Sequence, residues 1–183
     1  MAIENTVATL LAGAGLTEGR TTEERLTTLT TQLSAGVITV LEFQRRFKGE
    51  LALAYLNRYA SASVRVSNVG RNDLQHVSTL VERQTPFING FAADLSAGRE
   101  PIPTAQRISL YANGANTAGF AGIVAAASQG GQRLRWITSD DDRECEPCRE
   151  AGDGGPYTST TLPGLPGAIC AGGPNCRCSV ETI

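Results

Sequence analysis

Hydrophobic side chains recur every three or four residues from residue 21 to about residue 131, the spacing of one buried helix face. The pattern predicts four helices, over residues 21–34, 39–60, 72–98 and 104–130. Thr21 with Glu24, and Thr39 with Glu42, have the spacing of a capping box and mark the starts of the first two helices. Pro86 removes a backbone donor, so it must kink or break the third helix.

The pattern changes after residue 131. Polar and apolar side chains alternate over residues 133–138, as they do in a half-buried strand, and the remainder is rich in Gly, Pro and Cys. Residues 61–72 are predicted to form a connector, with a short extended piece at residues 64–66. The expected fold is therefore mainly α, with a helical body over residues 1–131 and a small β/loop module over residues 132–183.

Length and charge limit the classes of function. The 183 residues suffice for one ordinary domain with a small appendage. A net charge of −2 gives no general attraction to nucleic acid or to acidic lipid. The longest apolar run, residues 118–127, is far shorter than the roughly 20 residues that cross a membrane, and the N-terminus lacks the basic start of a signal peptide. We expect a soluble protein made in a reducing cytosol.

All five cysteines lie near the C-terminus, as a CxxC pair followed 21 residues later by a second group: Cys145, Cys148, Cys170, Cys176 and Cys178. Zn²⁺ prefers thiolates, and a two-residue spacer lets two sulfurs occupy neighbouring corners of a tetrahedron. The segment is also too small and too Gly-rich to fold on a core of its own. The pattern favours a structural zinc site that pins the module.

Two other uses of the cysteines stay open. Disulfides would leave one of the five thiols over, and the short rings of a CxxC or a CxC close with strain. A redox CxxC needs a helix running on from it to lower the thiol pKa, and the Gly/Pro content of residues 151–156 prevents a long one. Both alternatives are therefore ranked below zinc.

The remaining polar clusters indicate no catalytic site. The carboxylates of residues 140–142 lack EF-hand spacing, and we expect turn and cap chemistry there, with one Asp pairing Arg143 or Arg177. His76 is the only histidine and is expected on a helix surface. No nucleophile elbow or phosphate-binding glycine loop occurs. The small-residue face of the last predicted helix, around Gly119 and Gly122, serves internal packing or a subunit contact.

The C-terminal frame resembles the minor head (head morphogenesis) proteins of tailed bacteriophages, a family with a member in phage Mu. The matching run is Trp136-Ile-Thr-Ser-Asp140, then Arg143-x-Cys145-x-x-Cys148, and Pro174-Asn-Cys176-Arg-Cys178. More loosely, Phe91-Ala-Ala-Asp-Leu-x-x-Gly98 and Arg107-x-x-Leu-Tyr111-Ala are similar to the helices that precede this module in the family.

One departure from the family pattern affects the ligand set. Gly173 stands where the family has a histidine, and Cys170, three residues earlier, is the obvious substitute. The resemblance therefore implies Cys145, Cys148, Cys170 and Cys176 as the zinc ligands. Cys178 is the alternative ligand, or otherwise a supporting or free thiol.

The resemblance implies a structural virion protein, a minor capsid or head-assembly component that is assembled in the host cytoplasm. Its expected partners are the portal, the major capsid protein or neighbouring head components, with self-association as a further option. The zinc would be structural and no enzymatic step is expected. The rival hypothesis is a zinc-dependent nucleic-acid-binding module that uses Arg143, Arg149 and Arg177; a redox enzyme is the third.

Overall fold

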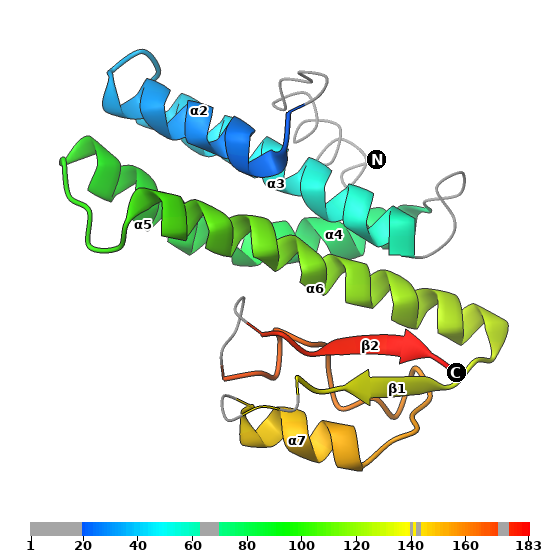
Figure 1. Cartoon of the computed structure of the whole chain (residues 1–183). Coiled ribbons are helices and arrows are strands. Elements are labelled where there is room, and N and C mark those ends of the chain that lie inside the picture. Colours follow the sequence, from blue (N-terminus) through cyan, green and yellow to red (C-terminus); the bar gives the residue numbers. More distant parts are fainter. Residues whose placement is uncertain (1–19, 63–69, 140, 142–143, 172–175) are drawn as a thin grey trace. The chain divides into compact units, whose positions relative to one another are not determined.

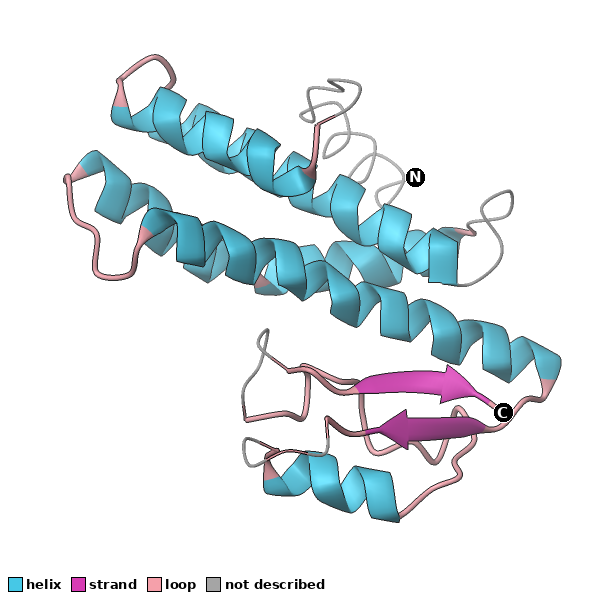
Figure 2. Ribbon diagram, viewed as in Figure 1, coloured by secondary structure: helices cyan, strands magenta, loops and turns pink. Residues whose placement is uncertain are grey.

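The protein is mainly helical and carries one small two-stranded sheet, which confirms the expected fold class (Figures 1 and 2). The computed structural model describes residues 20–62, 70–139, 141, 144–171 and 176–183. The elements in chain order are α2 (Thr22–Ser34), α3 (Val40–Ala62), α4 (Arg71–Arg83), α5 (Thr85–Ser96), α6 (Thr104–Gly130), β1 (Leu134–Ile137), α7 (Glu146–Asp153) and β2 (Ser179–Thr182). Among the described helices, none combines the length and the apolar character that a membrane span requires.

The chain divides into two compact units. The first comprises residues 1–56 and 69–112, and the second comprises residues 57–68 and 113–183. The second unit thus contains the later turns of α6 and the end of α3 in addition to the cysteine-rich segment. The domain boundary expected after residue 131 stays a prediction.

The two predicted capping boxes differ in how completely they form. At α2 the Thr21 N–H donates to Glu24 Oε2 at 2.6 Å and the Glu24 N–H donates to Thr21 Oγ1 at 3.2 Å. At α3 the Glu42 N–H donates to Thr39 Oγ1 at 3.2 Å, but the Glu42 carboxylate accepts from Arg45 at 2.9 Å. The first box is complete. In the second, the Glu42 carboxylate pairs with Arg45 in the same helix.

The third predicted helix is two helices, α4 and α5, separated at Gln84. Pro86 lies in the first turn of α5, where a missing backbone N–H leaves no helical hydrogen bond unmade. The Gln84 N–H donates to Val81 O at 3.0 Å and closes α4. The expected break is confirmed, and α4 begins at Arg71, one residue before the predicted start. The extended piece expected at residues 64–66 lies outside the described residues.

Aromatic rings form the centre of the first unit. Phe47 lies 5.1 Å from Phe43 and 5.0 Å from Tyr111, and Phe91 stacks on Tyr111 at 5.9 Å. All four side chains are buried. Such pairs contribute about 0.5–1.5 kcal/mol each beyond the burial of apolar area, so the aromatic positions fix how α3, α5 and α6 pack.

A charged network joins α5 to α6 within the same unit. The Arg107 guanidinium lies 4.6 Å from the centre of the Phe91 ring and donates to Asp94 at 2.8 Å. Arg99 also donates to Asp94, at 3.0 Å. The hydrogen bonds from Arg107, and then those from Arg99, hold the pKa of the Asp94 carboxyl below its usual value. Phe91, Asp94, Arg107 and Tyr111, which belong to the helical segments that loosely resemble the phage family, therefore contact one another.

The lowered pKa of Asp94 predicts a pH-dependent effect of Asp94→Asn. A carboxyl with a depressed pKa in the folded state stabilises the protein above its unfolded pKa, near 3.8, and that contribution disappears as the pH falls through the folded pKa. We expect Asp94→Asn to unfold at lower urea concentration than the wild type at pH 7. The difference should shrink toward zero below pH 3.8, and a difference that is equal at all pH values would contradict this account.

Two glycines of α6 lie against the end of α3, within the second unit. A Cβ on Gly122 would lie far inside van der Waals contact with the carbonyl oxygen of Tyr59. A Cβ on Gly119 would meet the Arg58 carbonyl oxygen at 3.8 Å, which is an ordinary contact. At these two positions the small-residue face therefore serves internal helix packing.

The glycine contacts predict opposite effects for two alanine substitutions. Gly122→Ala should destabilise the protein by about 1–3 kcal/mol, because the added methyl forces two helix backbones apart. Gly119→Ala is the matched control and should be neutral or stabilising by up to about 1 kcal/mol, because alanine is the better helix former and finds room. Thermal unfolding of the two variants and the wild type measures both effects, and equal destabilisation by both would exclude the close approach at Gly122.

The cysteine-rich segment of the second unit contains the sheet. β1 confirms the strand expected over residues 133–138 and pairs antiparallel with β2, with Trp136 opposite Val180. Leu134 and Tyr157 exchange two backbone hydrogen bonds of 2.8 Å. The buried side chains of this core are Ala127, Leu134, Trp136, Cys148, Ala151, Cys178 and Val180. Two of these seven are cysteines, so thiols form part of the small core.

Candidate metal centre

The cysteines reach the site from three segments of the chain. Cys145 is the N-cap residue of α7, and Cys148 lies in the first turn of that helix. The N–H groups of Cys148 and Arg149 both donate to the Cys145 carbonyl, at 3.0 and 3.1 Å, which sets the two sulfurs on the same side of the turn. Cys170 comes from the loop after α7, and Cys176 and Cys178 immediately precede β2.

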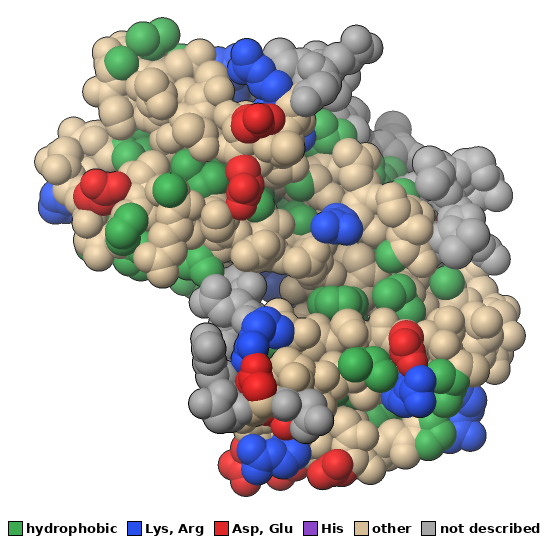
Figure 3. Space-filling view, viewed as in Figure 1, with side chains coloured by type: hydrophobic (Ala, Val, Ile, Leu, Met, Phe, Trp, Pro, Cys, Tyr) green, Lys and Arg blue, Asp and Glu red, His purple; other side chains and the backbone are tan. Residues whose placement is uncertain are grey.

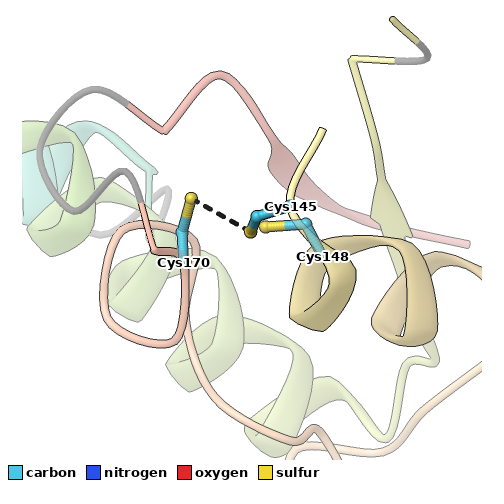
Figure 4. Close-up of side chains that lie close together, drawn as sticks. All are labelled: Cys145, Cys148 and Cys170. Atoms are coloured by element: carbon cyan, nitrogen blue, oxygen red, sulfur yellow. Dashed lines mark hydrogen bonds between the residues drawn. The ribbon is translucent and has the colours of Figure 1, made fainter. Parts of the chain in front are cut away.

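The five sulfurs form two groups of three that share Cys148. Cys145, Cys148 and Cys170 make one group (Figure 4), and Cys148, Cys176 and Cys178 make the other. Within each group all sulfurs lie within 4.8 Å of one another. The Cys145 and Cys170 sulfurs are 3.5 Å apart, and those of Cys148 and Cys176 are 3.9 Å apart. None of the five cysteines forms a disulfide.

These distances fit a metal held by sulfur. Four zinc–sulfur bonds of about 2.3 Å in a tetrahedron place the sulfurs about 3.8 Å apart. The two measured separations lie close to that value on either side. Thiolates are soft ligands that select zinc and other thiophilic ions over calcium or magnesium. The clustered cysteines can therefore bind a metal ion.

The two thiols of the CxxC motif differ in their acidity. The backbone N–H of Ala171 stabilises the Cys145 thiolate and lowers the pKa of this thiol to about 7. Burial raises the pKa of Cys148, whose side chain belongs to the core. Cys145 is thus prepared to lose its proton, whereas ionisation of Cys148 requires a compensating positive charge at the sulfur.

Two buried polar atoms beside the cysteines have no hydrogen-bond partner among the described residues. They are Trp136 Nε1, a donor, and Glu144 Oε1, an acceptor. Trp136 shares the core with Cys148 and Cys178. Cys178 lies two residues before Val180, which pairs with Trp136, and directly before the start of β2. A buried indole N–H in the same core as two thiols is a donor that ionised sulfurs could use as acceptors.

Two ion pairs involve residues that are neighbours of the cysteines in sequence. Arg177, between Cys176 and Cys178, donates to both carboxylate oxygens of Asp141. This confirms the expectation that one of the clustered Asp residues pairs with an arginine. Arg149 lies 3.8 Å from the Glu144 carboxylate. Asp140, Asp142, Arg143 and Gly173 lie outside the described residues.

Sequence reasoning missed two elements that position the cysteines. An eight-residue helix, α7, follows Cys145 directly, although the Gly/Pro content after residue 150 excluded only a long helix. β2 was expected to be loop, and its four residues carry Cys178 into the sheet. The capping position of Cys145, followed by Pro147 in the first turn, was the local signal for α7. His76 lies exposed on α4, in the first unit, as expected of a helix-surface residue.

Comparison of the chain with protein-family models, with curated proteins and with solved structures found no match.

Proposed function

We propose that this chain is a structural component of a tailed-bacteriophage head, a minor capsid or head-assembly protein whose C-terminal module folds around one zinc ion. The observation that supports the metal site is the convergence of the five thiols around Cys148 inside a small core. The head assignment rests on the sequence resemblance of the C-terminal frame. The ligands that the resemblance implies are Cys145, Cys148, Cys170 and Cys176, with Cys178 as the alternative. In the structure Cys145, Cys148 and Cys170 lie together, and Cys176 groups with Cys148 and Cys178.

A structural ion accounts for the site better than a catalytic one. Catalytic zinc sites keep one coordination position open for water or substrate. Here five sulfurs are available for four positions, and Cys148 and Cys178 are buried in the core. Among the described residues, the buried side chains of that core besides its two cysteines are Leu134, Trp136, Val180 and two alanines, and partly buried side chains such as Tyr157 and Ile169 pack against them. A segment with so few large buried side chains needs an additional cross-link to be stable, and a bound zinc ion would supply one.

The residues of the phage-like frame support the cysteines in this structure. Trp136 packs in the core with Cys148 and Cys178. A Cβ on Gly152 of α7 would meet Thr138 Cγ2 at 2.7 Å, so Thr138 packs closely against that helix. Arg177 is tied to Asp141. The resemblance therefore concerns residues that hold the module together, and the helices are free to supply surfaces for the portal, the major capsid protein or another head component.

The nucleic-acid alternative has weaker support. Arg149 and Arg177, two of the three arginines that could contact phosphates, pair with Glu144 and Asp141. On the face drawn in Figure 3, basic and acidic side chains lie beside one another around the sheet and α7, and no single basic patch forms there. Affinity for a phosphate backbone rises with the number of unpaired cations, so this face is a poor match.

Two measurements test the proposal. Elemental analysis of the reduced, purified chain should find one zinc ion per molecule. Mass spectrometry of purified particles, from the phage whose genome encodes the chain, should find it together with the head proteins. Absence of the chain from particles would overturn the head assignment. Salt-dependent DNA binding by the zinc-loaded chain would favour the nucleic-acid alternative instead.

A further inference from the structure

The arrangement of the sulfurs is more specific than a single tetrahedral site requires. In a four-sulfur zinc site every ligand lies near all three others. Here Cys148 is the one sulfur that belongs to both groups, and it interacts with each of the other four cysteines. Cys145 and Cys170 belong to one side of it, and Cys176 and Cys178 to the other.

A shared central sulfur is the arrangement of a thiolate that bridges two metal ions. The bridging ligand must lie near the terminal ligands of both ions, whereas terminal ligands need to approach only those of their own ion. Each group here supplies three sulfurs, which suits trigonal coordination, where metal–sulfur bonds of about 2.3 Å separate the sulfurs by about 4 Å. The separation of 3.9 Å between Cys148 and Cys176 is close to that value, and the 3.5 Å between Cys145 and Cys170 is shorter than it. The grouping of the sulfurs, and not these two distances, distinguishes this arrangement from a tetrahedral one.

The number of cysteines and their softness indicate which ions would fit. Two groups of three that share one sulfur need five cysteines, the number that the chain has. Zn²⁺ takes four ligands and leaves the fifth cysteine unused, whereas Cu(I) is a soft ion that thiolates select and that accepts three. We propose that the cluster holds two soft monovalent ions of the Cu(I) type, one in each group, bridged by the Cys148 thiolate. The thiol protons pass to solvent as the ions bind.

The proposal rests on the metal-binding role proposed for these cysteines above, and it replaces the single four-coordinate zinc ion by two three-coordinate ions. Cys178 is a ligand in this arrangement, which accounts for its buried position close to Cys148. Two monovalent ions leave five thiolates with more negative charge than one Zn²⁺ leaves four. The buried Trp136 N–H, which has no partner in the described part of the chain, is a donor suited to sulfurs of that charge.

The test loads the full, reduced chain with Cu(I), supplied as its acetonitrile complex without oxygen, and counts ions by native mass spectrometry. The expected count is two per chain, with three sulfurs around each copper and a copper–copper scattering path in the X-ray absorption spectrum. Cys170→Ser and Cys178→Ser should each lower the affinity for one of the two copper ions by about tenfold or more. Cys148→Ser should abolish the copper–copper path. Ser179→Ala, next to the cluster but without a sulfur, is the control and should keep both ions.

Each other result has a distinct meaning. One copper per chain, or two coppers without a copper–copper path, overturns the bridged pair and leaves the zinc proposal standing if zinc still binds one per chain. A chain that binds neither zinc nor copper loses both proposals. Two coppers that survive Cys148→Ser with three sulfurs each would also overturn the bridge.

Discussion

Replacing both Cys145 and Cys148 with serine is expected to release the metal and to loosen residues 132–183 while the helices of the first unit persist. Only three cysteines would remain, so no set of four sulfurs is left. Zinc binding of this kind contributes about 10–16 kcal/mol to folding at neutral pH, more than most small domains have in total stability. Amide exchange should therefore become fast throughout β1, α7 and β2 and stay slow in the buried turns of α3 and α5.

Two comparisons make this result specific. Wild-type protein stripped of metal by a chelator should give the same exchange pattern as the double variant. Cys178→Ser leaves the preferred ligands Cys145, Cys148, Cys170 and Cys176 in place and should still bind one zinc ion. If Cys178→Ser loses zinc and Cys170→Ser retains it, the fourth ligand is Cys178 and not Cys170.

Arg25→Met is expected to destabilise the first unit by about 3–5 kcal/mol, because it leaves a carboxylate buried without its cation. Arg25 Nε lies 2.5 Å from Glu50 Oε2, and the Glu50 side chain is only 5% exposed. The pair joins α2 to α3 in the interior of the helices, where water replaces the lost partner poorly. Urea unfolding at neutral pH measures the loss.

The double variant Arg25→Met with Glu50→Leu is the decisive comparison. It removes both charges, so most of the stability should return. Arg45→Met removes one partner of the exposed pair with Glu42 and should cost no more than about 1 kcal/mol. If the single and double variants at Arg25 and Glu50 are equally unstable, the loss comes from packing and not from an unpaired charge.

The helices could be predicted because their signals are local. The capping pair Thr21 and Glu24, the proline at residue 86 and the apolar spacing from residue 21 to about residue 131 define α2 to α6 with small errors at the ends. α7 escaped prediction because eight residues carry little periodicity. β2 escaped because a four-residue strand is fixed by its partner β1, more than 40 residues away in sequence, and not by its own pattern.

The candidate site, like the fold, was predictable from the sequence only in part. Residue type and spacing were enough to expect that four of the five cysteines gather, with Cys178 as an alternative, and the structure brings all five together. Spacing does not determine which sulfurs become neighbours, because Cys170, Cys176 and Cys178 reach the CxxC motif through loops. The central position of Cys148 depends on the packing of α7 against β1, which nothing in the local sequence encodes. The identity of the four zinc ligands remains a prediction.

Because Cys178 is so close to β2 along the chain, the cysteine cluster also constrains the register of that strand. Cys178 directly precedes Ser179, where β2 begins. A slip of the pairing by one residue would turn Val180 to solvent and bring Glu181 inward, because alternate side chains face opposite sides. When Cys178 is held beside Cys148, no residue between it and β2 can absorb such a shift. The cysteine cluster thereby selects one alignment for a strand pair that is too short to select its own.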